Sequence, residues 1–302
     1  MSRKAIIDVG SNSIKFFLGE RNPDGTLKTV MDENDIARLG EGLRETGAIS
    51  PEAMRRNSGA ISIFAEKARE HGADEIACVG TMALRNATNS TEFVNLVEEV
   101  AGLKLRIIPG EEEARLAYLS VLSGLTLQGG KLAVFDTGGG STEFIFGEGN
   151  TVSSRFSLDI GAIRITEKYF ADTRPEQSDV NAAIAEIDSA LSAVSGDVDQ
   201  LVGMGGTLTS MGAVKHKMAR YDPDVIQGSV LTFADVDRQI EDYSSKTAEE
   251  RKGIIGLQPK RADVILAGAC IVKVIMSRLG VDKLTVSDRG LRHGLAFEML
   301  VK

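Results

Sequence analysis

The sequence predicts an α/β protein made of two similar halves, each built around a mixed β-sheet. Short apolar strands alternate with amphipathic helices along the chain, and the order of elements in the first half returns in the second. A glycine-containing turn is also repeated, as IIDVGSNSIKFFLG at 6–19 and VFDTGGGSTEFIFG at 134–147. The positions that match in type and spacing are Asp8 and Asp136, Gly10 and Gly138, Ser13 and Ser141, Phe16 and Phe144, and Gly19 and Gly147.

The first half is expected to begin with three strands and to continue with alternating helices and strands. The turn residues NPDG at 22–25 separate the second strand from the third. Ser50 and Pro51 open a long helix, because serine caps helix N-termini and proline suits the first helical position. The expected strands are 4–9, 14–20, 26–31, 75–79 and 104–108, and the expected helices are 51–71, 90–101 and 111–122.

The second half repeats this order, with one addition. The expected strands are 131–135, 142–146, 151–157, 200–204 and 283–286, and the expected helices are 162–170, 178–194, 207–217, 259–279 and 289–301. An extra polar helical stretch at 233–253 has no counterpart in the first half. The glycine-rich segment 124–130 is the natural seam. We therefore expect one domain over 1–124, joined by the helix at 290–302, and a second over 125–289, facing each other across a cleft of the kind that commonly binds ligands.

Composition restricts the class of protein. The chain has 302 residues, 42% of them apolar and 26% charged, as in soluble globular proteins. Its start has no apolar core of a signal peptide, and its longest apolar run, 264–272, is about half of the ~20 residues that a membrane span needs. Cys78 and Cys270 lie in apolar stretches far apart, which favours buried free thiols in the cytoplasm. The net charge of −8 argues against nucleic-acid binding.

The repeated turn has the features of an anion-binding loop. Asp136 ends a strand, and Gly138, Gly139 and Gly140 can adopt positive φ angles and let backbone N–H groups approach a ligand. Ser141 adds a hydroxyl donor. The alternative is an ordinary glycine hairpin with a solvated aspartate. P-loop, dinucleotide-binding and serine-hydrolase signatures are not matched.

Eight segments together resemble the exopolyphosphatase and guanosine pentaphosphate phosphohydrolase (Ppx/GppA) family in its short form. They are DVGSNSIK at 8–15, GTMALRNA at 80–87, PGEEEARLAY at 109–118, DTGGGSTEF at 136–144, GAIRITEKYF at 161–170, GMGGT at 203–207, RADVILAGA at 261–269 and SDRGLRHG at 287–294. The resemblance spans nearly the whole chain. It implies two RNase-H-like domains of the actin and hexokinase superfamily, and hydrolysis of a terminal phosphoryl group by water.

The resemblance also implies roles for individual residues. Glu113 matches the catalytic glutamate, although acidic residues in a first helical turn are also common without any function. Asp136 is expected to hold Mg²⁺ or Mn²⁺, with Glu143 and Asp8 as second choices. The expected phosphate-binding residues are Ser11, Asn12, Ser13, Arg85, Gly138, Gly139, Gly140, Ser141, Gly205, Gly206 and Thr207. Lys15 stands where family members carry arginine, and the motif residues Arg164 and Arg289 receive no role.

The expected activity is release of terminal orthophosphate from inorganic polyphosphate. Guanosine pentaphosphate is the close alternative substrate, and the sequence does not separate the two. Alternatives of another class are an ATP-dependent small-molecule kinase and a non-catalytic phosphate or nucleotide sensor, because a fold alone does not define a function. The family resemblance also implies a homodimer.

Overall fold

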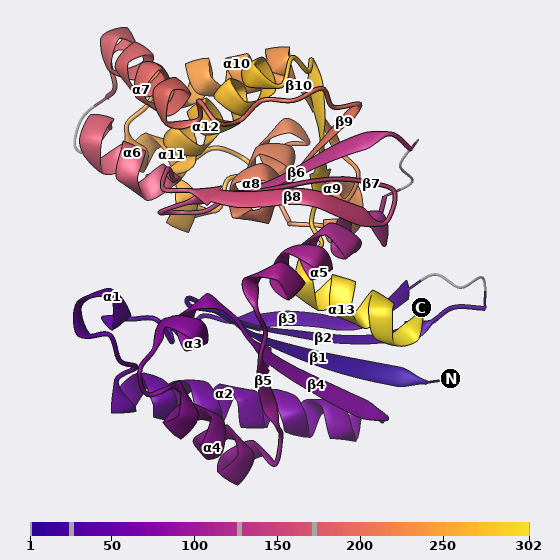
Figure 1. The fold of residues 1–302 in the computed structure, drawn as a ribbon. Helices are drawn as coiled ribbons and strands as arrows, with labels where there is room; N and C mark the ends of the chain where they lie inside the picture. Colours follow the sequence, from indigo (N-terminus) through magenta and orange to yellow (C-terminus); the bar gives the residue numbers. More distant parts are fainter. Residues whose placement is uncertain (1, 24–26, 126–128, 171–173, 302) are drawn as a thin grey trace. The chain divides into compact units, whose positions relative to one another are not determined.

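The computed structural model describes residues 2–23, 27–125, 129–170 and 174–301 (Figure 1). The chain divides into two compact units. The first unit contains Met1–Ser123 and Gly290–Lys302, and the second contains Gly124–Arg289. Parts of three predicted elements lie outside the described residues. They are residues 24–25 of the turn at 22–25, residue 26 at the start of the third strand, and residues 126–128 of the seam.

The first unit has a five-stranded mixed sheet with the order β3-β2-β1-β4-β5. Strands β1, β4 and β5 run parallel, whereas β2 and β3 are antiparallel to their neighbours. The strands are β1 (Arg3–Val9), β2 (Ile14–Arg21), β3 (Leu27–Asp35), β4 (Glu75–Gly80) and β5 (Leu105–Ile107). The helices are α1 (Leu43–Thr46), α2 (Pro51–Glu70), α3 (Met82–Asn86), α4 (Ser90–Ala101), α5 (Gly110–Leu122) and α13 (Leu291–Leu300).

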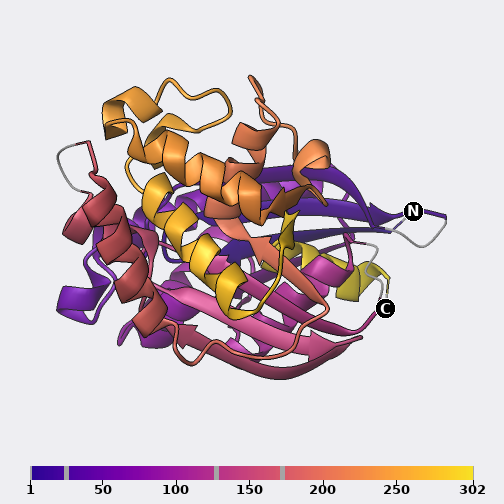
Figure 2. The ribbon, with the colours of Figure 1, turned by 90° about the horizontal axis from the view of Figure 1, so that it is seen from above.

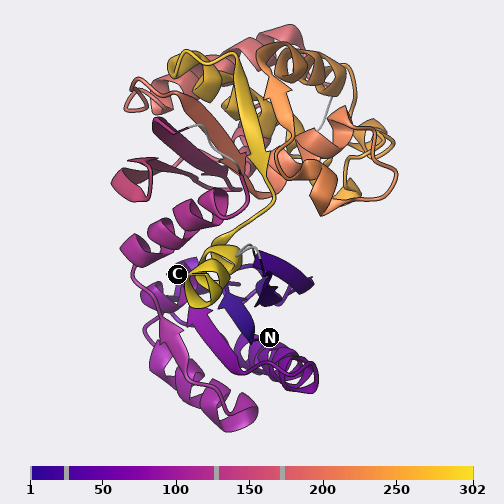
Figure 3. The same ribbon diagram turned by 90° about the vertical axis from the view of Figure 1, so that its right-hand side faces the viewer.

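Helices cover both faces of this sheet (Figures 1 and 3). Helices α2 and α4 enclose one apolar cluster with the sheet, and α5 and α13 enclose a second one. Gly294 lets α13 approach α5 closely, because a Cβ atom there would lie 1.9 Å from the carbonyl oxygen of Leu116. Ser50 caps α2 as predicted, since its side chain accepts from the N–H of Ala53 at 3.2 Å.

The second unit has a six-stranded sheet with the order β10-β11-β9-β6-β7-β8. Read from the other edge, it repeats the first sheet and adds β10, which confirms the predicted duplication. Helix α12 packs between α7 and α10 (Figure 2). The strands are β6 (Lys131–Thr137), β7 (Thr142–Glu148), β8 (Thr151–Leu158), β9 (Gln200–Met204), β10 (Val230–Thr232) and β11 (Lys283–Ser287). The helices are α6 (Ala162–Tyr169), α7 (Gln177–Ala190), α8 (Gly205–Lys215), α9 (Pro223–Ile226), α10 (Phe233–Ser244), α11 (Ala248–Arg251) and α12 (Ile265–Arg278), with a 3₁₀ turn at Pro259–Arg261.

Two predicted helices differ from the structure. The stretch at 259–279 is a 3₁₀ turn followed by α12, which begins only at Ile265. The stretch at 233–253 is two helices, because Thr247 and Glu250 form a capping box that starts α11. The short elements α1, α3, α9 and β10 were not predicted; none exceeds five residues, which is too short for a periodic pattern.

Cys78 and Cys270 are buried free thiols, as predicted. Burial raises the pKa of each thiol to about 12. Within the described ranges, no helix has the length and apolar character that crossing a membrane requires.

Candidate functional site

The two predicted turns have the same structure. The N–H of Gly10 donates to the carbonyl of Ser13 at 3.1 Å, and the N–H of Gly138 donates to that of Ser141 at 2.9 Å. Register matches as well, since Asp8 pairs with Lys15 across β1 and β2, and Asp136 pairs with Glu143 across β6 and β7. Directly paired residues of antiparallel strands share a face, so each turn begins with an aspartate beside a second charged side chain.

Most candidate residues of the first unit lie at one edge of its sheet. Strands β1, β4 and β5 are parallel, so their carboxyl ends meet at the same edge. Strand β1 leads into the turn 10–13, β4 into helix α3 with Arg85, and β5 into helix α5 with Glu113. Backbone hydrogen bonds join these ends, from Thr81 to Val9 at 3.3 Å and from Ile108 to Gly80 at 3.0 Å.

The central contact at this edge joins Arg85 to Glu113. Nη1 of Arg85 lies 2.7 Å from Oε2 of Glu113, and it also donates to the carbonyl of Ile108 at 2.8 Å. The two side chains are about one third exposed, at 28% and 34%. Glu112, one residue earlier, instead pairs with Arg106 at 2.7 Å. Of these two glutamates, Glu113 is therefore the one that contacts Arg85. The phosphate-binding role of Arg85 stays a prediction.

Asp8, a second choice for the metal ion, is buried. Its side chain is 6% exposed, and Nζ of Lys15 lies 3.9 Å from its Oδ2. The neighbouring cation compensates part of the aspartate charge.

The glycine turn of the second unit differs from the prediction in its backbone. None of Gly138, Gly139 and Gly140 has a positive φ angle. Gly139 allows close packing instead, since a Cβ atom on it would lie 2.6 Å from Cδ1 of Ile163. The carbonyls of Gly138 and Gly139 accept from the N–H groups of Ala162 and Ile163 at 3.0 and 2.9 Å. The turn is thus fixed against the first turn of α6.

Ser141 and Glu143 contact each other. The hydroxyls of Ser141 and Ser157 donate to Oε1 of Glu143 at 2.6 and 3.0 Å. The structure therefore brings together a predicted phosphate donor and a predicted metal ligand. Ser157 completes this group, and no sequence motif had pointed to it.

In the second unit, Asp136 at the end of β6 lies close to the start of α8. Gly205 has φ +84, and a Cβ atom on it would lie 2.0 Å from Oδ1 of Asp136. A Cβ atom on Gly206 would lie 1.8 Å from Nη2 of Arg261. No side chain caps α8, so its first N–H groups and the helix dipole favour an anion here. Thr207 has a structural contact, since its hydroxyl donates to the carbonyl of Thr137 at 3.2 Å.

Arg261 is a site residue that the sequence analysis did not select. Burial lowers the pKa of its guanidinium, and the nearby Asp136 carboxylate opposes that shift. Arg261 lies in the quoted segment RADVILAGA, but its contact with Gly206 joins positions far apart in the chain. Arg261 ends the 3₁₀ turn at Pro259–Arg261, where a continuous helix was predicted, and its guanidinium lies near Gly206.

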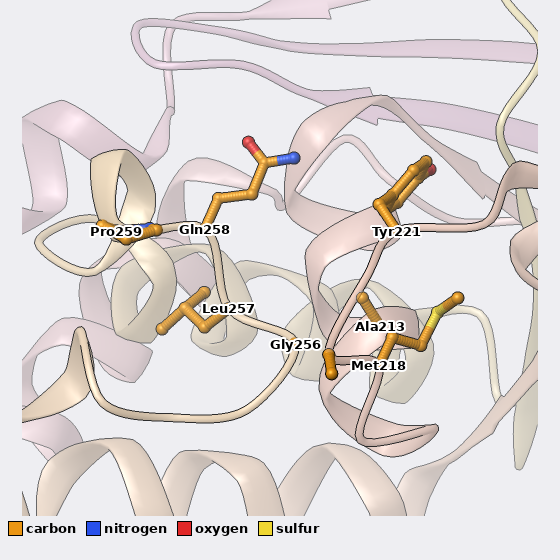
Figure 4. A pocket seen from close by; sticks show the side chains of 8 residues that line it. Ala213, Met218, Tyr221, Gly256, Leu257, Gln258 and Pro259 are labelled. Atoms are coloured by element: carbon orange, nitrogen blue, oxygen red, sulfur yellow. The ribbon is translucent and has the colours of Figure 1, made fainter.

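A hollow of about 210 Å³ lies a few residues from Arg261 in the same unit. Met218 and Leu257 give it an apolar floor, and Tyr221 and Gln258 extend from it to the same side (Figure 4). The hydroxyl of Tyr221 donates to Oδ1 of Asp288 at 2.5 Å. The hollow therefore combines an aromatic ring, a carboxamide and apolar side chains.

The sequence profile of the Ppx/GppA phosphatase family matches residues 20–302. The chain belongs to this family. Exopolyphosphatase 2 of Mycobacterium tuberculosis is 33% identical over 99% of both chains. A guanosine-5'-triphosphate,3'-diphosphate pyrophosphatase of Photobacterium profundum is 33% identical over 99% of this chain and 59% of that protein.

The solved structures agree with this assignment. The crystal structure of the Aquifex aeolicus member of the Ppx/GppA family has a TM-score of 0.91 and 33% identity, over 99% of this chain and 97% of that one. The chain thus has the two-domain actin and hexokinase fold that the sequence resemblance implied.

The remaining motif residues of this Ppx/GppA phosphatase have structural contacts. Arg164 donates to the carbonyl of Asp159 at 2.8 Å. Arg289 packs on Gly124, where a Cβ atom would lie 2.5 Å from its Cδ. The carboxamide of Gln227 donates to the carbonyl of Gly124 at 3.1 Å and accepts from the N–H of Asp288 at 2.8 Å. One glutamine therefore ties together the two ends of the second unit.

A divalent ion would have few protein ligands in this Ppx/GppA phosphatase. Among the described residues, no group of three or more His, Cys, Asp or Glu side chains is arranged to hold a metal. Mg²⁺ usually keeps several waters and binds one or two carboxylates together with substrate phosphates. Asp136 and its cross-strand partner Glu143 fit that pattern, because both carboxylates project from the same face beside the glycine turn.

Proposed function

We propose that this protein is an exopolyphosphatase, which hydrolyses the terminal phosphoanhydride bond of inorganic polyphosphate and releases orthophosphate. The observation that carries the proposal is the pair of Glu113 and Arg85, 2.7 Å apart, at the same edge of the sheet as the turn 11–13. The similarity to a named exopolyphosphatase over 99% of both chains supports the choice of substrate.

Glu113 is the general base of the proposed reaction. Its carboxylate accepts a proton from a water molecule as the water oxygen bonds to the terminal phosphorus. The bond between that phosphorus and the bridging oxygen breaks, and the bridging oxygen stays with the shortened chain. Arg85 restricts the Glu113 carboxylate to one position, which keeps the base oriented toward the water.

The phosphoryl oxygens carry the charge that the site must stabilise. In the second unit, the first N–H groups of α8 and the guanidinium of Arg261 are the proposed donors, at Gly205 and Gly206. In the first unit, the turn 11–13 is the proposed phosphate-binding segment. Asp136, with Glu143, would hold Mg²⁺ or Mn²⁺, which when bound neutralises charge on the phosphate oxygens.

A side-by-side assay tests the proposal. Long polyphosphate, tripolyphosphate, guanosine pentaphosphate and ATP are incubated with the protein and Mg²⁺, and orthophosphate is measured. Release from long polyphosphate without any acceptor supports hydrolysis and argues against a kinase. A protein that binds these compounds and releases nothing is a sensor, and the proposal is then wrong.

Guanosine pentaphosphate is the second candidate substrate. Several relatives that are 33–34% identical carry the name guanosine-5'-triphosphate,3'-diphosphate pyrophosphatase. The hollow beside Tyr221 and Gln258 offers a ring and a carboxamide, which suit a nucleobase. Comparison of kcat/KM for polyphosphate and guanosine pentaphosphate decides between the two substrates. If the hollow binds the nucleobase, Gln258→Ala should lower kcat/KM for guanosine pentaphosphate and leave that for polyphosphate unchanged.

We also propose a cytoplasmic homodimer. Buried free thiols at Cys78 and Cys270 are compatible with a reducing compartment, and the dimer follows from the family resemblance. Light scattering coupled to size-exclusion chromatography measures the mass, and a mass near the 32.3 kDa of one chain would contradict the dimer.

A further inference from the structure

Arg38 has a backbone conformation that its residue type disfavours. Its φ angle is 47°, and among the described residues other than glycine only Lys217 also has a positive φ. In this region the Cβ atom of an L-residue crowds the backbone, and glycine or asparagine would fit with less strain. Such strain persists where the surrounding contacts enforce it, and it clusters at functional sites.

The loop around Arg38 is attached to the turn that contains Ser11 and Asn12. The N–H of Arg38 donates to the carbonyl of Asn12 at 2.9 Å, and the N–H of Gly40 donates to that of Ser11 at 2.8 Å. The carbonyl of Arg38 accepts from Nη2 of Arg56 at 3.2 Å. These bonds fix the main chain of Arg38 from both sides, so they account for how the strained conformation is held.

Arg38 also lines a surface hollow of about 390 Å³, together with Ser11, Asn12, Gly40 and Glu41. The Glu41 carboxylate is compensated, because Nη2 of Arg56 lies 2.9 Å from its Oε2. No ion pair of Arg38 occurs within the part of the chain that the structure describes. The hollow therefore joins one turn of the candidate site to an exposed cation whose charge is not neutralised by a protein partner.

We propose that Arg38 binds the phosphoryl groups that follow the terminal one in a polyphosphate chain, and that it thereby favours long chains over short ones. This inference rests on the proposed function. Glycine at this position would relieve the strain, whereas only a cation gives charge-assisted hydrogen bonds to phosphate oxygens. Arg38 therefore contributes a positive charge to the hollow, which glycine at this position would not.

Binding measurements in the full-length Glu113→Gln protein test this role without turnover. Long polyphosphate and orthophosphate are titrated by calorimetry into that protein and into the same protein with Arg38→Gly added. Loss of one charged contact should raise the Kd for long polyphosphate about 10-fold. The Kd for orthophosphate, which occupies only the terminal position, should not change. Equal Kd values for long polyphosphate in both proteins would overturn the proposal.

Matched variants separate binding from folding. Arg55→Ala removes another exposed arginine, one whose Nε donates to the carbonyl of Pro51, and should leave both Kd values unchanged. Arg38→Lys keeps the charge and should retain most of the affinity, and Arg38→Gly should have a Tm no lower than the parent. An equal loss of affinity in both Arg38 variants, with a lowered Tm in each, would show backbone damage and overturn the proposal.

The Arg38 titrations and the hydrolysis assay can fail independently of each other. If the wild-type protein releases no orthophosphate from polyphosphate, the exopolyphosphatase proposal fails. The titrations still decide whether Arg38 binds a linear polyanion.

Discussion

Nη1 of Arg85 lies 2.7 Å from Oε2 of Glu113, and the same nitrogen donates to the carbonyl of Ile108. The arginine thus links the candidate base to the end of a sheet strand. A carboxylate on the first turn of a helix would otherwise sample several rotamers. The pair fits the proposed role of Glu113 as the base, because it limits the positions of the carboxylate.

Replacement of Glu113 by glutamine should remove the proton acceptor while keeping the shape of the side chain. We expect kcat for polyphosphate hydrolysis to fall by roughly 10²–10⁴-fold, the usual contribution of a general base, with little change in KM. Glu112→Gln is the matched control, because Glu112 pairs with Arg106 instead. Phosphate release measures both variants, and equal rates for Glu113→Gln and wild type would exclude Glu113 as the base.

Arg85 should act through Glu113. We expect Arg85→Ala to lower kcat by about 10-fold or more in the wild-type background, as expected for loss of a charge-assisted bond. In the Glu113→Gln background the same change should have almost no effect, because the carboxylate that it positions is gone. A full, additive loss in the double variant would instead indicate that Arg85 contacts the phosphate directly.

Gly205 should be intolerant of a side chain. Its φ of +84 and the 2.0 Å approach of Asp136 Oδ1 to a built Cβ both oppose Gly205→Ala. We expect the free energy of unfolding to fall by about 1 kcal/mol or more, from the backbone term alone. Gly140→Ala is the control, since no atom lies within 4 Å of a Cβ there. Urea titration measures both, and an equal loss of stability in the two variants would refute this explanation.

Asp32 should make the first unit more stable at neutral pH than in acid. Burial raises the pKa of its carboxyl group, but the hydrogen bond from His293 and the Arg292 guanidinium outweigh burial and lower that pKa overall. Arg292 donates to both carboxylate oxygens at 2.7 and 2.9 Å. A lowered pKa in the folded state stabilises the protein above the unfolded value of about 4, and this contribution is lost as the pH falls through the folded value.

Asp32→Asn tests this dependence. We expect it to reduce the free energy of unfolding at pH 7 by about 1.5–3 kcal/mol, the range for a hydrogen bond to a charged group. The difference from wild type should shrink below pH 4, where the carboxylate of the unfolded wild-type chain is already protonated. Urea midpoints at pH 7 and pH 3.5 measure it, and a constant difference would contradict the assignment.

The sequence predicted the repeated turns because their signal is local. Asp8 and Asp136 stand at the same distance from the glycines and serines that follow them, and the strand register repeats that spacing. Glu113 was selected through a family resemblance, and the Arg85 contact was then found beside it.

Long-range contacts escaped the sequence analysis. Arg261 reaches Gly206 from a separate segment, and no pattern near either residue reports that approach. The glycines at 138–140 were expected to provide positive φ angles, but none of them has one, and Gly139 instead provides space for Ile163 of α6. Only the fold shows whether a neighbouring atom excludes a side chain at a glycine, and which atom that is.

Helix α13 has a consequence for how the protein is made on the ribosome. Leu291, Leu295 and Ala296 pack with Ile6 and Phe17 in the apolar cluster that α5 also covers. Among the described elements this helix is translated last, so the nascent N-terminal sheet emerges with part of one apolar face uncovered. If translation stalls before Gly290, apolar surface of the N-terminal sheet stays exposed and can aggregate. Loss of α13 would thus destabilise the unit that contains β1 and β2.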